Sequence, residues 1–295
     1  MSKPINHHFV SQCHLKEFFN PEEKRIFLYD KQLSNFYYKS GTRNIFSMDY
    51  LNNRLINEEL DQESMELELR VLFEDKFSKH LQSVKRLYED HSLVAEVYDD
   101  LNYLALMALV GEYRNPEYKQ GLDDVFASMD EQLKLRGAKI PEKTPNDLVL
   151  FSNMKGYIDV AFLLLEKMDP ITFAIVSIRS DDHFIVPDTS GFLVRYNLES
   201  GPVMQFGLPI SDKLFILGRS AAMGLYPTTL VEITENNGNL VFKINSDLIN
   251  YSYKTVACKD EIFLKKTIGR MREIGFIGQY FHRTTIGSPE KDRSV

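Results

Sequence analysis

The chain has 295 residues, of which 43% are hydrophobic and 26% charged, and its formal net charge is −7. This composition is typical of a soluble globular protein with a sizeable core. No run reaches the ~18 consecutive apolar residues that cross a membrane, and the first five residues lack the apolar core of a signal peptide. The negative charge argues against a broad basic surface for nucleic acid.

The two cysteines, Cys13 and Cys258, lie far apart in the sequence. Two cysteines without an export signal indicate a reducing cytoplasm rather than a disulfide framework, so we expect a cytoplasmic protein. The sequence lacks the phosphate-loop and Rossmann glycine patterns, a paired-cysteine zinc site, a helical His-Glu-x-x-His motif and a Gly-x-Ser-x-Gly elbow. These absences exclude only the enzyme classes that carry those signatures.

The stretch 6–19 is unusual for the beginning of a chain, which is normally frayed. It holds three of the seven histidines. Leu15, Phe18 and Phe19 follow the i, i+3, i+4 spacing of one helix face. The stretch therefore predicts a short helix that docks on the core. After it, aromatic and β-branched residues in 24–40 predict a pair of strands.

The middle of the chain, residues 57–167, reads as helical. Apolar residues recur every three or four positions over 57–90, which predicts one long helix with Glu74 among its solvated charges. Residues 101–110 are apolar nearly all round, so this helix should lie inside the protein. It should end before Pro116, which disfavours helix in the preceding residue. Two further helices are expected at about 121–136 and 147–167.

From residue 171 onward, short apolar runs predict a sheet over 171–245, with strands at 171–178, 184–186, 191–196, 203–206, 213–217 and 240–244. Residues 236–239 read as a turn before the last of these strands. Closing helices follow within 246–275, at 248–256 and 262–274, and residues 286–295 read as a disordered tail. This order predicts an α+β fold, with a mostly antiparallel sheet, a helical middle region and closing C-terminal helices. We expect a single domain over 1–285, in which the early strands join the late sheet.

The opening His7-His8-Phe9-Val10-Ser11-Gln12, followed by Leu15 and Phe18, resembles that of a bacterial and fungal domain family of unknown function numbered four thousand two hundred and thirty-eight. Ser11 stands where the family usually has proline, and both residues suit a helix start. The family has no assigned activity, so the resemblance implies architecture and candidate positions from His7 to about residue 280. Further matches to its short motifs are Arg114, Ser180, Asp181 and Asn245.

His7 and His8 could ligate a divalent metal or act as general acid and base, because histidine titrates near neutrality. The alternative is that one of them pins the first helix through a backbone hydrogen bond. Gln12, from the same motif, is a candidate binding residue.

Arg114 closes the most apolar helix. Its guanidinium could satisfy the carbonyls at the helix end, or it could bind a phosphate or carboxylate with two donors. Ser180 and Asp181 follow a strongly apolar strand, where a carboxylate is well placed for metal or proton chemistry; the alternative is a turn in which Asp181 bonds the backbone. Asn245 could bind a ligand or cap a closing helix.

These residues lie at the ends of predicted elements, where sites are usually built. Our first hypothesis is a hydrolase that acts on a phosphodiester or nucleotide. It could be metal-assisted, with His8 and Asp181 as base or ligand and Arg114 on a phosphate. The scattered occurrence of the family suits a role in defence against mobile elements.

The alternative is a non-catalytic sensor or protein-interaction module whose polar residues fix the N-terminal helix on the sheet. A third option is nucleic-acid binding by basic residues near the C-terminus, which could equally form a solvated helix face; they are Lys254, Lys259, Lys265, Lys266, Arg270 and Arg272. The substrate, small molecule or nucleic acid, and any divalent metal cofactor stay open.

Overall fold

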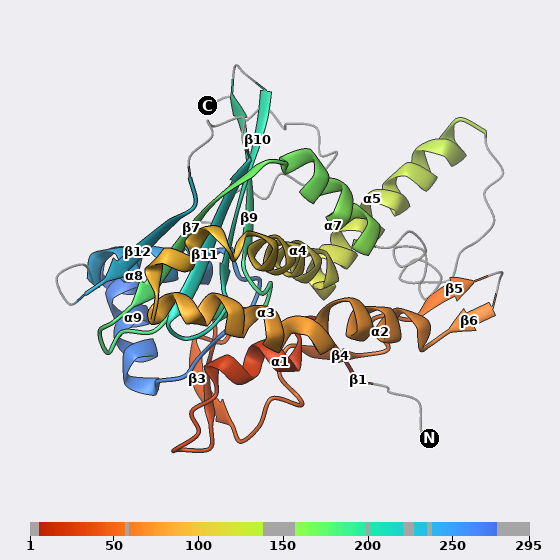
Figure 1. The fold of residues 1–295 in the computed structure, drawn as a ribbon. Helices are drawn as coiled ribbons and strands as arrows, with labels where there is room; N and C mark the ends of the chain where they lie inside the picture. The colour runs from red at the N-terminus through yellow and green to blue at the C-terminus, as the bar shows by residue number, and fades with distance from the viewer. Residues whose placement is uncertain are drawn as a thin grey trace.

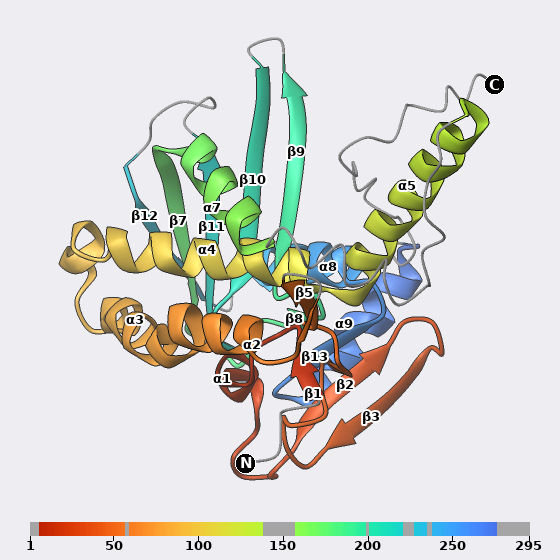
Figure 2. The ribbon, with the colours of Figure 1, turned by 90° about the vertical axis from the view of Figure 1, so that its right-hand side faces the viewer.

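The computed structural model describes residues 6–56, 59–137, 157–198, 201–220, 227–234 and 238–275. A five-stranded sheet lies at the centre, with helices on one face and a second sheet and further helices beyond the other (Figures 1 and 2). This architecture confirms the α+β class with mostly antiparallel sheets. None of the described helices is long and apolar enough to span a membrane.

The central sheet has the strand order β12-β7-β11-β10-β9. Its strands are β7 (Ile171–Ile178), β9 (Phe192–Leu198), β10 (Gly201–Pro209), β11 (Leu214–Ser220) and β12 (Thr229–Ile233). All pairs are antiparallel except β12 and β7, which run parallel. Four of these strands were predicted, whereas β12 was missed because it is short and half exposed, without a continuous apolar run.

β7 shows why this sheet is covered on both faces. Ile171, Phe173 and Ile175 join the core cluster beneath the helices, whereas Val176 and Ile178 join the cluster on the opposite face. A strand buried on both sides reads as a continuous apolar run, which is the pattern of residues 171–178. Its identification from the sequence was therefore straightforward.

The helical layer is built around α4, which packs against α3 and α7 (Figure 2). Its elements are α2 (Ser64–Leu69), the π-helical turn η2 (Arg70–Glu74), α3 (Asp75–Lys85), the 3-10 turns η3 (Arg86–Tyr88) and η4 (His91–Ala95), α4 (Tyr98–Arg114), α5 (Pro116–Leu135) and α7 (Tyr157–Met168). Leu101 and Leu104 are fully buried, in agreement with a central helix. The predicted residues 147–156 lie outside the described part of the chain.

The helix expected from residue 57 begins later. Its first part is replaced by a hairpin of β5 (Arg54–Ile56) and β6 (Glu59–Asp61). The carboxylate of Asp61 accepts from the backbone N–H groups of Glu63 and Ser64. These bonds cap the start of α2, because they satisfy N–H groups that have no partner within the helix.

The predicted early strand pair is correct, but it joins a different sheet from the one expected. β2 (Ile26–Asp30) and β3 (Asn35–Lys39) form a separate four-stranded sheet with β13 (Thr255–Cys258) and β8 (Val186–Pro187), in the order β3-β2-β13-β8. β13 was predicted as the end of a helix over 248–256, and it is instead a fully buried strand. The early strands therefore pair with late residues, outside the five-stranded sheet.

The closing region also differs from the prediction over 240–244. This run was read as a strand, but it lies within α8 (Gly238–Tyr251), and Gly238 and Asn239 begin the helix rather than forming a turn. A run of five mostly apolar residues is too short to distinguish a strand from a buried helix face. The last helix, α9 (Glu261–Glu273), matches the predicted 262–274. Residues 236–237 and the predicted tail 286–295 lie outside the described residues.

The N-terminal segment is docked, as expected. β1 (Asn6–His8) pairs with β4 (Ser47–Asp49), and α1 (Gln12–Leu15) continues into the 3-10 turn η1 (Lys16–Phe18). Leu15 and Phe18 are fully buried in the cluster that also holds residues of the two larger sheets. The apolar edge predicted from the sequence therefore faces the core.

Candidate functional site

His7 is fully buried and supports the N-terminal strand through the backbone. Its Nδ1 accepts a hydrogen bond from the N–H of Asn52 at 2.9 Å. The Asn52 side chain in turn donates to Glu66 and accepts from Lys119 Nζ at 3.2 Å. His7 thus holds the backbone at Asn52, whereas the structural alternative named the first helix.

Arg114 ends α4 with its side chain inside the protein, only 4% exposed. Its Nη2 lies 3.5 Å from Glu66 Oε1, and its Nη1 lies 3.5 Å from Glu74 Oε1. The partner that a buried charge requires is thus supplied by two carboxylates of this chain. Glu74 is half-buried rather than solvated, because the wider π-helical turn of η2 changes the face that follows α2.

His8 lies beside this ion-pair cluster. The side chain is buried, and burial together with the nearby Arg114 cation lowers its pKa. The neutral imidazole is therefore the favoured form. Among the described residues, no hydrogen-bond partner contacts its Nε2. His8 thus lies near enough to Arg114 for the cation to act on the imidazole, whereas the sequence hypothesis required both to share one site with Asp181.

His14 was not singled out from the sequence, yet its side chain is buried like that of His7. Its Nε2 donates to the Pro209 carbonyl at 2.5 Å, and its ring packs against Phe18 and Phe77. Complete burial lowers its pKa to about 4. Its position four residues before Phe18, on the apolar edge of α1, was the available signal for a core histidine.

The start of α1 differs from the expected cap. Ser11 occupies the N-cap position but makes no capping hydrogen bond; its Oγ instead lies 3.1 Å from Cys13 Sγ. Burial raises the pKa of the Cys13 thiol to about 11, so the thiol is protonated near neutral pH. Gln12 begins α1 and is half-buried.

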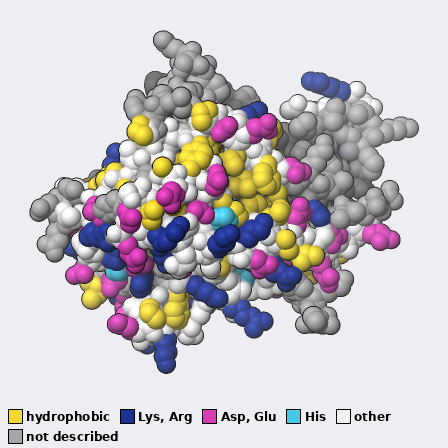
Figure 3. Space-filling model, in the orientation of Figure 1, with side chains coloured by type: hydrophobic (Ala, Val, Ile, Leu, Met, Phe, Trp, Pro, Cys, Tyr) yellow, Lys and Arg dark blue, Asp and Glu magenta, His cyan; other side chains and the backbone are white. Residues whose placement is uncertain are grey.

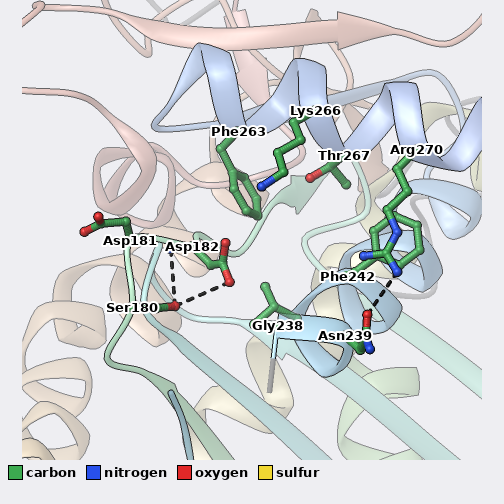
Figure 4. Close-up of a pocket in the computed structure, with 11 residues that line it drawn as sticks. Ser180, Asp181, Asp182, Gly238, Asn239, Phe242, Phe263, Lys266, Thr267 and Arg270 are labelled. Atoms are coloured by element: carbon green, nitrogen blue, oxygen red, sulfur yellow. Dashed lines mark hydrogen bonds between the residues drawn. The ribbon is translucent and has the colours of Figure 1, made fainter. Parts of the chain in front are cut away.

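The loop after β7 contains the second group of candidates. Ser180 Oγ accepts from the N–H of Asp182 and donates to its Oδ2, both at 3.4 Å (Figure 4). Lys213 Nζ donates to the carbonyls of Ser180 at 2.8 Å and Asp182 at 2.6 Å. A turn is therefore present, as the alternative interpretation expected, but Ser180 forms it rather than Asp181.

This loop forms one wall of a pocket of about 430 Å³. The other walls are the start of α8 and one face of α9, which presents Lys266, Thr267 and Arg270 (Figure 4). Arg270 Nη2 donates to Asn239 Oδ1 at 2.9 Å, and its guanidinium lies 3.9 Å from the ring centre of Phe242. The guanidinium is thus held in one orientation at the mouth of the pocket.

The two aspartates of the loop differ in direction. Figure 4 shows the carboxylate of Asp182 turned toward the pocket and that of Asp181 turned away from it. Asp182 Oδ2 lies 3.5 Å from the place that a Cβ on Gly238 would occupy, at the first residue of α8. A carboxylate is stabilised at a helix N-terminus by the N–H groups and dipole there. The sequence indicated this loop, but with Asp181 as its candidate carboxylate and not Asp182.

The candidates do not all line one cavity. Arg114 lines a space of about 20 Å³, room for a single water, together with Ser11, His14 and Glu74. Ser180 and Asp181 line the α8–α9 pocket, which shares no residue with that space. The sites of Arg114 and Asp181 are therefore separate cavities.

Asn245 supports the loop that forms one wall of the pocket. It is fully buried within α8, where its Oδ1 accepts from the N–H of Ile185 at 3.0 Å and its Nδ2 donates to the His183 carbonyl at 2.8 Å. It is thus not an N-cap. Its bonds fix the segment that follows Asp182.

A charged cluster lies directly behind the pocket. Asp212 Oδ2 lies 3.2 Å from His183 Nδ1 and 3.1 Å from Lys259 Nζ. Although burial opposes its charge, these two partners keep the pKa of Asp212 below its usual value. The ring of His183 meets Phe263, which lines the pocket, edge to face. No group of three metal-ligating side chains occurs among the described residues.

The basic residues near the C-terminus are mostly engaged within the chain. Lys265 pairs with Glu261 at 2.8 Å, Lys259 with Asp212, and Arg272 donates to the Tyr29 hydroxyl at 2.9 Å. Figure 3 shows acidic and basic side chains interspersed over the face that it presents. These contacts favour a solvated helix face over a nucleic-acid surface.

The family comparison agrees with the opening motif. The model of the family described as "Protein of unknown function (DUF4238)" matches residues 6–261, so the chain belongs to this family. No curated protein and no solved structure matches the chain.

Proposed function

We propose that this member of the DUF4238 family binds a nucleotide or a related phosphate ester in the α8–α9 pocket and hydrolyses it. The observation that carries the proposal is the pocket itself, in which Lys266 and Arg270 lie on one wall and Asp182 on another. A volume of about 430 Å³ falls within the range of small-molecule sites. The proposed reaction class is the hydrolysis that the sequence suggested, but the residues proposed to carry it are different.

The roles follow from charge and position. Arg270 and Lys266 neutralise the phosphate oxygens, and the guanidinium can offer two parallel donors to them. Asp182 accepts a proton from the attacking water. The oxygen of that water bonds to phosphorus as the bond between phosphorus and the leaving oxygen breaks. A role for His8, Arg114 and Asp181 in the same reaction stays a prediction, since Asp181 points away and the other two lie elsewhere.

The test is nucleotide binding by calorimetry beside an assay of phosphate release, with generic nucleotides and dinucleotides as probes. Replacing Lys266 and Arg270 together by alanine should abolish binding. Lys265→Ala is the matched control, because Lys265 lies on the same helix, is exposed and does not line the pocket. Equal binding by the double variant and the wild type would contradict the proposal.

The second candidate function is a non-catalytic sensor or interaction module. It is favoured by two contacts within this chain: His7 accepts from the backbone of Asn52, and Arg114 of α4 pairs with Glu66 of α2. Under this reading the α8–α9 pocket binds its ligand without turnover. Tight nucleotide binding with no phosphate release at any pH tested would select it over the hydrolase.

A further inference from the structure

The two cations of the pocket are spaced for more than one phosphate. Lys266 and Arg270 are four residues apart on α9, which places them on one face about one turn apart. Arg270 is already oriented by Asn239 and Phe242, whereas Lys266 makes no ion pair with any residue that the structure describes. One fixed and one free cation in a row fit two successive phosphates of a diphosphate better than a single phosphate.

A carboxylate faces the same space. In the view of Figure 4, Asp182 lies on one side of the pocket, Arg270 on the other, and Lys266 projects from α9 between them. Lys213 holds the backbone carbonyl of Asp182 at 2.6 Å, and Ser180 holds its carboxylate, so the acid is fixed in place. A diphosphate bound to the cations would therefore lie close to a fixed negative charge, which is unfavourable unless a cation lies between them.

We propose that the pocket takes a diphosphate group together with Mg²⁺. One carboxylate oxygen of Asp182 is the protein ligand of the metal, and its other oxygen keeps the role of proton acceptor. This inference rests on the proposed function and names its ligand. Mg²⁺ is usually bound through one or two carboxylates plus substrate phosphates, and it keeps several waters. One carboxylate beside a diphosphate site meets that requirement, so metal and ligand bind as a pair.

The test measures pyrophosphate binding by calorimetry, with Mg²⁺ and with a chelator, in the full chain. Wild type should bind pyrophosphate about 5- to 150-fold more tightly with Mg²⁺, the usual range of coupling between two ligands. The same factor should appear when Mg²⁺ is titrated with and without pyrophosphate, because coupling is reciprocal. Inorganic phosphate should bind more weakly than pyrophosphate.

Asp182→Asn keeps the size of the side chain and should remove the dependence on Mg²⁺. Asp181→Asn is the matched control. It makes the same change in charge at the neighbouring residue, whose carboxylate is turned away from the pocket. Thermal unfolding checks that both variants fold. If Asp182→Asn does not fold, Asp182→Ala replaces it, because it also removes the carboxylate and should also remove the dependence on Mg²⁺.

The outcomes separate the two claims. The metal inference is overturned if pyrophosphate binds equally well with and without Mg²⁺, or if Asp182→Asn and Asp181→Asn change the Mg²⁺ dependence equally. Either result leaves the proposed function standing. Failure of every nucleotide and of pyrophosphate to bind, with and without Mg²⁺, overturns both.

Discussion

Arg114 provides the sharpest test of whether the polar residues near the N-terminus stabilise the fold or bind a ligand. Replacing it by methionine removes the guanidinium but keeps an unbranched side chain of similar length. Glu66 and Glu74 would then face each other's charge without this cation. Breaking a buried pair by removing one partner costs about 3–5 kcal/mol.

The expected cost is lower here, because the two carboxylates are 22% and 28% exposed and water recovers part of their hydration. We therefore expect a loss of about 2–3 kcal/mol in the free energy of unfolding. Urea unfolding followed by circular dichroism measures this loss, and an unchanged m-value shows that the transition itself is the same.

The control is the triple variant in which Glu66 and Glu74 also become glutamine. It should regain most of the lost stability, because no unpaired carboxylate is left. A single variant as stable as the wild type, to within about 0.5 kcal/mol, would show that the cluster does not stabilise the fold. Arg114 would then return as a candidate for binding an external anion.

Three further changes test the fold. Removing residues 1–19 deletes Leu15 and Phe18, both fully buried, and should cost about 3–6 kcal/mol; an unchanged melting temperature would contradict the docking of this segment. Leu106→Asp places an unpaired charge in α4 at a side chain only 7% exposed, so soluble, cooperatively unfolding protein would be the contrary result. His14 has a pKa of about 4 against an ordinary 6.5. Because the unfolded chain binds its proton first, stability should fall by about 3 kcal/mol as the pH drops from 6.5 to 4. His14→Gln should flatten that slope, and an equal slope in both proteins would refute the assignment.

The elements that could be predicted from the sequence are those with a long, unambiguous pattern. Residues 101–110 of α4 are apolar nearly all round, and β7 is a continuous run buried on two faces. The start of α8 was predicted wrongly, because the five residues from Leu240 to Ile244 fit the period of a strand as well as that of a helix. β13 was missed because the strand has only four residues, Thr255 to Cys258, and its partner strands lie far away in the sequence.

The candidate site shows the same limit at the level of single residues. Arg114 was found, but its partners Glu66 and Glu74 precede it by dozens of residues, and no local pattern records the contact. Asp181 was chosen and Asp182 passed over, although neighbouring residues in an extended segment point opposite ways. Which of the two faces the pocket is decided by α8 and α9, which lie far along the chain.

The pairing of β2 with β13 has a consequence for synthesis of the chain. The ribosome releases β2 early, but the strand that completes its sheet emerges roughly two hundred residues later. At a translation rate of about 5–20 residues per second, the edge of β2 stays without β13 for roughly 10 to 40 seconds. An unpaired edge of this kind is a template for association between chains. Nascent or prematurely terminated chains of this protein should therefore depend on chaperones, even though the finished fold leaves that edge fully covered.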